Sequence, residues 1–276
     1  MNLAYIPSPT FSKFEIGPFT IHMYAICILI GICVAVWILA TRWKRYGGTF
    51  DQILDTTLVT VPCALVGARL YHCITTPADY FPPTGNLVNI LKVWEGGMAI
   101  FGGISVGTLV AFLWCRHKHY PFAIFADAIA PALPVAQAIG RLGNWFNQEL
   151  YPTFLYEMIW NLIGAALIIY LGHKLADRLK AGQQFAMYLM WYGLGRTWIE
   201  NVRINYSTVI LGLRTNVWTA IIVFVLGCIL FVVLYQYGPD PKAQARGLAA
   251  VTADELERQS IEEEQLRQKK QTNRTK

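Results

Sequence analysis

Charged side chains are scarce in this sequence of 276 residues: they make up 14% of the chain, against about 25% in soluble domains. Hydrophobic residues make up 55%. Apolar stretches close to the roughly 20 residues that a membrane helix needs recur along the first 237 positions. These features exclude a soluble globule and a disordered chain, and they indicate a polytopic membrane protein.

Paired cysteine motifs and internal repeats are also missing. The six cysteines lie within or at the ends of apolar stretches without CxxC spacing, which excludes a disulfide scaffold and a thiolate metal site. The absence of repeated halves argues against an inverted-repeat transporter. The formal net charge of +6 is spread over short connections, so a conventional nucleic-acid-binding domain is excluded as well.

We expect an all-α fold of seven transmembrane helices. Lysine and arginine gather in the connections after the first, third and fifth apolar stretches, and the positive-inside rule places these connections in the cytoplasm. The N-terminus is then outside and the C-terminus is cytoplasmic. Residues 1–237 form the transmembrane domain, and residues 238–276 form a polar cytoplasmic tail that is partly helical or disordered. The predicted spans are 18–40, 53–73, 97–115, 121–139, 153–172, 184–199 and 216–237.

Two of these spans carry residues that shape a helix. Pro131 and Pro134 interrupt the fourth span, and we expect it to be kinked or partly re-entrant because proline removes backbone hydrogen bonds. Small residues, including Gly103 and Gly107 in a GxxxG spacing, fill the third span. They favour close packing against another helix.

Ionisable residues within the predicted spans gather on one side. A single one could be a helix-end side chain that reaches the lipid headgroups. Several in one layer indicate a cavity or groove, because charges that face acyl chains are costly. Arg196 and Glu200 are four residues apart and therefore share a helical face. The residues that we expect near the external surface of the bilayer are Arg69, His72, Arg141, Glu149, Glu157, Arg196, Glu200 and Arg203.

An arginine-rich layer at the level of the headgroups points to phosphate chemistry. Arginine binds phosphate in a bidentate way and keeps its charge when it is partly desolvated. Such a layer would suit a lipid-processing enzyme, a lipid-binding structural protein or an anion transporter. An intramembrane hydrolase would need a Ser/His, Ser/Lys or two-Asp pair, and Asp55 and Asp127 are the candidates for the last of these.

Several motifs resemble those of the prolipoprotein diacylglyceryl transferase family. The segment from Gly140 to Glu149 closely resembles the signature of that family. Further motifs follow in the order found in the family: Pro18 to Tyr24, Gly67-Ala68-Arg69, Trp94-Glu95-Gly96-Gly97-Met98, Phe101-Gly102-Gly103, Asp127-x-x-Ala130-Pro131, Pro152-x-x-Leu155-Tyr156-Glu157 and Gly195-Arg196-x-x-x-Glu200-x-x-Arg203.

The resemblance implies an enzyme of the bacterial plasma membrane. It would move the diacylglyceryl group of phosphatidylglycerol onto the lipobox cysteine thiol of a prolipoprotein, form a thioether and release glycerol phosphate. This reaction is the first step of bacterial lipoprotein maturation. The transmembrane domain would then be catalytic, with its active site toward the external leaflet and with no metal or other cofactor.

The resemblance also suggests roles for the polar residues. Arg141 and Arg196 would hold the phosphate and offset the charge that grows on it in the transition state. Glu200 would orient Arg196 or help to take the thiol proton. The other expected contacts to phosphatidylglycerol are Tyr24, Asn144, Glu149, Arg203 and Arg69.

Two features depart from the family pattern. Phe101 stands where some members carry a histidine that is proposed as the catalytic base, so the base would be another group or solvent acting on the thiol. Glu149 is followed almost directly by Pro152, where the family has a substantial external stretch. Either the chain has lost this element or the sequence omits it, and its loss would bear on acceptor binding and activity.

Overall fold

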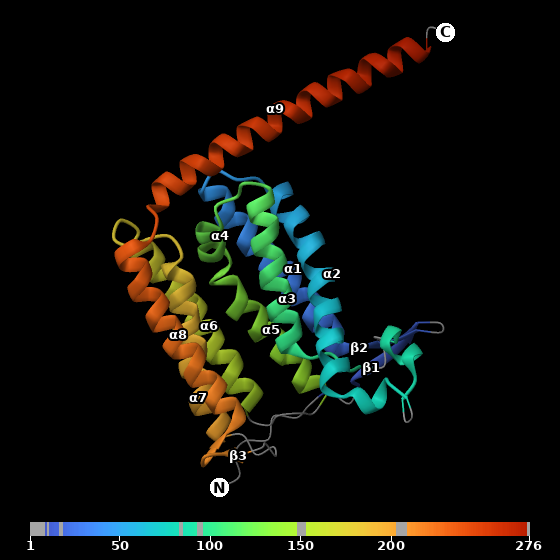
Figure 1. Ribbon diagram of the computed structural model, residues 1–276, viewed down its shortest axis with the longest axis vertical. Coiled ribbons are helices and arrows are strands. Elements are labelled where there is room, and N and C mark those ends of the chain that lie inside the picture. Colours follow the sequence, from blue (N-terminus) through green and yellow to red (C-terminus); the bar gives the residue numbers. More distant parts are fainter. Residues whose placement is uncertain are drawn as a thin grey trace. The chain divides into compact units, whose positions relative to one another are not determined.

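A computed structural model of the chain consists mostly of helices (Figure 1). The contacts among its residues divide the chain into two units. The first unit comprises residues 1–46 and 123–247, and the second comprises residues 47–122 and 248–276. The structure describes residues 9, 11–16, 19–82, 85–92, 96–147, 153–202 and 209–274.

The long helices of the first unit pack as a series of neighbouring pairs. Helix α5 packs against both α1 and α6, and α7 packs against both α6 and α8 (Figure 1). The shorter helix α4 directly precedes α5. The helices of this unit are α1 (Met23–Arg45), α4 (Phe122–Ile129), α5 (Ala132–Phe146), α6 (Thr153–Lys174), α7 (Gln183–Val202) and α8 (Thr215–Tyr237).

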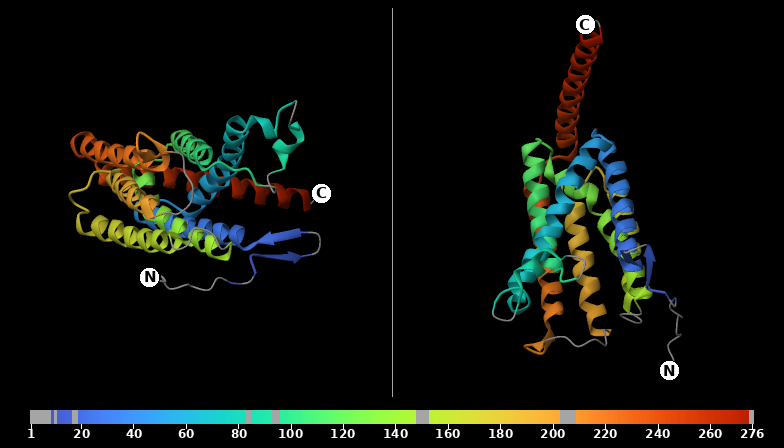
Figure 2. Two further views of the ribbon diagram at one scale, coloured as in Figure 1. Left: turned by 90° about the horizontal axis from the view of Figure 1, so that it is seen from below. Right: turned by 90° about the vertical axis from the view of Figure 1, so that its right-hand side faces the viewer.

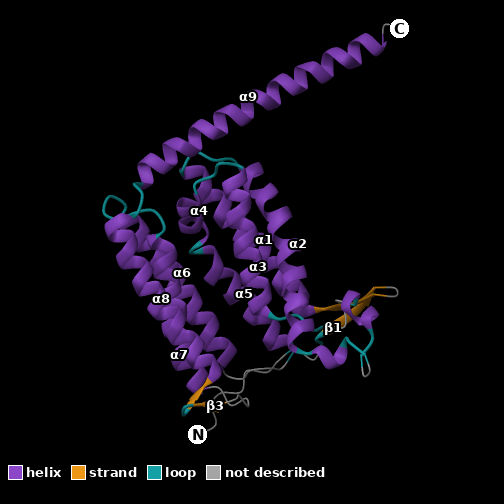
Figure 3. Ribbon diagram, in the orientation of Figure 1, coloured by secondary structure: helices purple, strands orange, loops and turns teal. Residues whose placement is uncertain are grey.

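Two short antiparallel strand pairs lead into helices of the first unit (Figure 3). Strands β1 (Lys13–Ile16) and β2 (Phe19–His22) run directly into α1, as Figure 2 shows. Strands β3 (Val209–Ile210) and β4 (Leu213–Arg214) precede α8. Both turn residues between β3 and β4 have positive φ, 50° at Leu211 and 80° at Gly212. A type I′ hairpin requires this geometry, and the turn fixes where α8 begins.

The second unit consists of a helix pair, two 3₁₀ turns and most of a long C-terminal helix. A Cβ atom on Gly67 of α2 would overlap Val106 and the carbonyl of Gly102 on α3. The small residues of the third predicted span therefore serve close helix packing, as expected. The elements are α2 (Phe50–Thr75), η1 (Pro77–Asp79), η2 (Leu87–Leu91), α3 (Ile100–His117) and α9 (Pro241–Arg274), which joins this unit from residue 248 onward.

Each predicted span overlaps a helix of the structure, and the all-α polytopic membrane fold is confirmed. Among the described residues, six helices are long and apolar enough to cross a membrane: α1, α2, α3, α6, α8 and the segment Phe122–Phe146 that contains α4 and α5. Helix α7 is not among these six. Its glutamines, arginine and glutamate lower its hydropathy, and Gln183, Gln184 and Glu200 are buried.

The fourth predicted span is broken where its prolines lie. Helix α4 ends at Ile129, and α5 begins at Ala132 directly after Pro131. Pro131 and Pro134 are both fully buried. The predicted kink is therefore confirmed, and the backbone bends inside the protein, where irregular structure is tolerated within a membrane.

The buried carboxylate of Asp127 in α4 caps the start of α7. Its Oδ2 accepts the N–H of Gly182 at 2.7 Å, and its Oδ1 accepts those of Gln184 at 2.8 Å and Phe185 at 3.2 Å. Arg42 of α1 donates to the Gln184 side chain at 2.6 Å and to the Asp127 carbonyl at 3.1 Å. The first N–H groups of a helix lack partners within the helix, so this carboxylate satisfies them and fixes α7.

Helix α9 docks within the second unit through a polar contact. Gln52 of α2 donates to Thr252 at 3.0 Å and to Glu255 at 2.9 Å, and the Tyr120 hydroxyl donates to Glu255 at 2.9 Å. Burial and the hydrogen bond to Glu255 both raise the pKa of Tyr120, so its hydroxyl keeps the proton that it donates. Ala249 packs on Gly47, where a Cβ atom would lie 3.0 Å from the alanine methyl.

We predict that Asp127→Asn destabilises the protein by about 1–3 kcal/mol, because the amide cannot accept all three N–H groups and leaves a buried donor without a partner. The measurement is thermal unfolding of the purified protein in detergent. The matched control is Asp177→Asn, because the Asp177 side chain is 86% exposed and its surface pair with Lys242 is worth little. Equal melting temperatures for the two variants would contradict the capping role.

Candidate active site

Four residues of the predicted polar layer form a continuous chain of ion pairs in the first unit. The Glu157 carboxylate of α6 bridges two arginines: its Oε1 lies 2.7 Å from Arg196 Nη1 of α7, and its Oε2 contacts Arg141 Nε of α5. Arg196 Nη2 also pairs with Glu200 Oε2 at 2.9 Å. Three helices thus meet at one charge cluster, as expected for polar residues in a membrane protein.

The two ends of this chain of ion pairs differ most in exposure. The Arg141 side chain is 32% exposed, that of Arg196 17%, that of Glu157 9% and that of Glu200 1%. A ligand therefore reaches Arg141 most readily, whereas the Glu200 side chain is buried. Arg141 is the outer contact of the cluster, and Glu200 is part of its support.

Two residues at the start of α8 complete the environment of Glu200. Asn216 donates its Nδ2 to Glu200 Oε1 at 3.0 Å. Arg214 donates to the Glu200 carbonyl at 3.0 Å and lies 3.9 Å from its carboxylate. The sequence analysis does not identify either residue as part of the site. The sequence offers only one sign of them, a pair of polar residues directly before the last apolar stretch. Such a pair by itself indicates no more than a helix end.

Two further predicted contacts lie beside Arg141 in the first unit. Asn144 accepts a hydrogen bond from Arg141 Nη1 at 3.3 Å and is buried. Tyr24 of α1 packs on Gly143, where an added Cβ atom would lie 3.1 Å from the tyrosine Cα. The glycine allows α1 to approach α5 closely. Arg141 and Asn144 are thus in contact, and Tyr24 lies against the residue that precedes Asn144.

Arg69 has a different set of partners, all within the second unit. Its guanidinium donates to the carbonyls of Ile90 at 3.0 Å, Gly97 at 2.9 Å and Lys92 at 3.1 Å, and also to those of Asn89 and Gly96. Arg69 is 5% exposed. It holds these five backbone carbonyls together, and its expected contact with phosphatidylglycerol stays a prediction.

Of the other positions that the sequence singles out, Phe101 lies within the described residues. Glu149 and Arg203 lie outside the described residues, as does the junction between Tyr151 and Pro152. Phe101 is 48% exposed, with its ring 6.5 Å from that of Tyr71. Its apolar ring cannot take a proton, so a base from this position is excluded.

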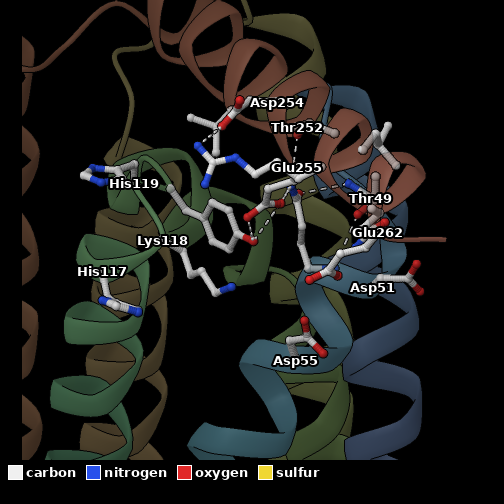
Figure 4. Close-up of a pocket in the computed structure, with 16 residues that line it drawn as sticks. Thr49, Asp51, Asp55, His117, Lys118, His119, Thr252, Asp254, Glu255 and Glu262 are labelled. Carbon is white, nitrogen blue, oxygen red and sulfur yellow. Dashed lines mark hydrogen bonds and ion pairs between the residues drawn. The ribbon is translucent and has the colours of Figure 1, made fainter. Parts of the chain in front are cut away.

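A cavity of about 530 Å³ lies in the second unit, where the ends of α2 and α3 meet α9 (Figure 4). Its charged lining is mostly acidic, with Asp51, Asp55 and Glu262 on one side of the balance and Lys118 on the other. The Glu255 carboxylate at its centre is held by Tyr120 and Gln52 in the α9 contact described above. The cavity is therefore a feature of α9 docking and lacks the paired arginines of the charge cluster.

The charge cluster carries a surplus of positive charge. Its described members are Arg141, Arg196 and Arg214 against the carboxylates Glu157 and Glu200. The formal sum is one positive charge, which a single phosphodiester anion would neutralise. Among the described residues, no group of three His, Cys, Asp or Glu side chains is placed to hold a metal ion. The arrangement is suited to hold a phosphate and to stabilise it as a leaving group.

Comparison with known proteins identifies the family. The sequence model of the prolipoprotein diacylglyceryl transferase family matches residues 12–233. Three relatives are named phosphatidylglycerol–prolipoprotein diacylglyceryl transferase. A protein of Bifidobacterium longum (strain NCC 2705) is 88% identical, with all of both chains covered. One of Bifidobacterium adolescentis is 53% identical over 93% of this chain and 88% of the relative, and one of Streptomyces griseus is 42% identical over 87% and 80%.

The alignment with the Bifidobacterium longum protein also bears on the short external loop. It spans 315 positions and covers all 276 residues of this chain, so 39 positions have no counterpart here. The deletion predicted before Pro152 from the family motifs would account for such a difference. The match of the family model over most of the sequence and the identity with these relatives show that the chain belongs to the prolipoprotein diacylglyceryl transferase family.

Proposed function

We propose that this chain transfers the diacylglyceryl group of phosphatidylglycerol to the lipobox cysteine of prolipoproteins. The sulfur bonds to the glycerol carbon, the bond from that carbon to the phosphate oxygen breaks, and glycerol phosphate leaves with the electron pair. The names of the relatives supply donor and acceptor. The observation that carries the proposal is the ion-paired cluster of Arg141, Glu157, Arg196 and Glu200, which together with Arg214 has a formal charge of one positive.

Arg141 and Arg196 bind the donor phosphate in this proposal. Arg141 is the more exposed of the two and meets the phosphate first, while Arg196 is fixed by two carboxylates. Because the arginines are held before the substrate arrives, they stabilise the negative charge that develops on the leaving phosphate without reorganisation. Tyr24, Asn144, Glu149 and Arg203 contact the glycerol headgroup, and Arg69 acts through the backbone carbonyls that it holds together.

Glu200 orients Arg196 in this proposal. Its side chain is 1% exposed and is engaged by Arg196 and Asn216, so the acceptor thiol does not reach it. Of the two roles that the resemblance suggests, the geometry supports orientation over proton transfer. The thiol has an ordinary pKa of roughly 8.5 and gives its proton to solvent or to another group.

We further propose a topology of seven spans in the bacterial plasma membrane, with α7 as the span beyond the six apolar ones. The basic end of α1 meets the basic end of α6, where Arg45 lies 3.2 Å from His173. The charge cluster lies away from these basic ends: Glu157 is near the N-terminus of α6, and Arg196 and Glu200 are near the C-terminus of α7. By the positive-inside rule the basic ends are cytoplasmic, so the cluster faces the external leaflet and the N-terminus is outside.

This topology also brings the two substrates together. Phosphatidylglycerol in the external leaflet and the signal peptide of an exported prolipoprotein both reach the outer end of the first unit. Residues 1–237 form the catalytic domain, and the chain from residue 238, which includes α9, is cytoplasmic. The reaction uses no metal or other cofactor.

We predict that Arg141→Lys lowers kcat/KM by at least about tenfold and Arg141→Ala by about 10²–10³-fold, because an ammonium lacks the planar pair of donors and alanine removes the charge. The assay places purified protein in phosphatidylglycerol bilayers with a lipobox peptide and measures peptide mass and released glycerol phosphate. A Cys→Ser peptide is the substrate control. Lys174→Ala, at the basic end of α6, is the matched variant and keeps wild-type activity.

Different results of this assay separate the possible failures. If the wild type forms no product but binds phosphatidylglycerol in an Arg141-dependent way, the shortened loop has removed acceptor use. If it neither transfers nor binds, the proposed function is wrong for this chain.

We predict that Glu200→Gln keeps at least about a tenth of the wild-type kcat, whereas Glu200→Ala loses about 10²-fold. The amide oxygen of glutamine still accepts from Arg196, but alanine leaves a buried guanidinium with one partner fewer. Single-turnover transfer and thermal unfolding are measured together. A Glu200→Gln variant as inactive as Glu200→Ala, with an unchanged melting temperature, would instead identify Glu200 as the base.

A further inference from the structure

Glu157 joins the two arginines assigned to the phosphate through its two carboxylate oxygens. Arg141 on α5 contacts Oε2, and Arg196 on α7 contacts Oε1 at 2.7 Å. Two guanidiniums this close repel each other strongly in a medium of low dielectric constant. The carboxylate removes this repulsion and sets the separation of the two side chains.

A phosphodiester resembles this carboxylate in the features that arginine recognises. Both carry one negative charge and present two oxygens to guanidinium donors. The separation of Arg141 and Arg196 is set by the two oxygens of Glu157. The same separation therefore suits two oxygens of a phosphate. The same donors then serve either anion, so Glu157 and a bound phosphate compete, most directly at Arg141, whose side chain is the more exposed.

We propose that Glu157 is a positioning residue that also promotes product release, by competing with glycerol phosphate for Arg141 and Arg196. The proposal rests on the proposed function. The phosphodiester of the donor carries one negative charge, but the phosphate monoester that leaves carries about two at neutral pH. Two arginines with a surplus of positive charge would hold this product more tightly than the donor. The nearby carboxylate counters this by re-forming its two ion pairs as the product departs.

The arrangement of the cluster lets Glu157 act in this way without disturbing the interior. Glu200 keeps Arg196 oriented through a second ion pair at 2.9 Å, and Asn216 keeps Glu200 in place at 3.0 Å. An anion that displaces Glu157 therefore leaves Arg196 with a partner. Arg141 retains only its contact with Asn144 among the described residues, at 3.3 Å, and is the arginine whose partner is most easily exchanged.

The test compares Glu157→Gln with Glu157→Asp. Glutamine removes the competing charge, so we expect the inhibition constant of glycerol phosphate to fall by about tenfold or more, the equivalent of about 1.4 kcal/mol, while kcat for repeated turnovers falls. Aspartate keeps the charge and is expected to hold the inhibition constant within about threefold of wild type. A purely structural role would lower the melting temperature and weaken glycerol phosphate binding in both variants.

A binding measurement separates this inference from the proposed function. Isothermal titration of the detergent-solubilised protein with glycerol phosphate needs no turnover, and inorganic sulfate serves as the reference anion. Tighter glycerol phosphate binding by Glu157→Gln supports competition even if the wild type forms no lipidated peptide. Unchanged or weaker binding by Glu157→Gln, in a variant that unfolds at the wild-type temperature, overturns the proposal even if the wild type is fully active.

Discussion

Burying a charge among apolar helices costs free energy, and the structure of the first unit depends on offsetting that cost. At one end of α7 the carboxylate of Asp127 is stabilised by three backbone N–H groups. At the other end Arg196 pairs with Glu200 and, through Glu157, is linked to Arg141. Helix α7 is too polar to be counted among the apolar spans, and these contacts are what allow it to pack with them. The ion pairs that offset the cost of burying these charges also form the candidate active site.

Some residues of the cluster hold the arginines in place, and others are exposed for contact with a ligand. Glu200 and Asn216 are internal and hold Arg196 in a fixed orientation. Arg141 is partly exposed and has fewer constraints. A site of this kind combines a rigid arginine with an accessible one, which suits a reaction in which a phosphate must be held during bond cleavage and then released.

Much of the fold follows from simple properties of the sequence. A helix that crosses a membrane needs a minimum apolar length, and for this reason six of the seven predicted spans overlap apolar helices of that length among the described residues. Pro131 breaks the fourth span because proline cannot continue the hydrogen-bond ladder. The four-residue spacing of Arg196 and Glu200 also predicts their ion pair, since it depends only on helical periodicity.

The sequence by itself therefore determined which residues are polar, which helices carry them, and which neighbours within one helix can meet. Only the tertiary structure decided the partners between helices. Glu157 joins Arg141 to Arg196, and Arg69 donates to the carbonyls of residues such as Ile90 and Gly97. Such pairs depend on the rotation and register of one helix against another. These are set by the packing of many side chains at once, which the periodicity of a single segment does not encode.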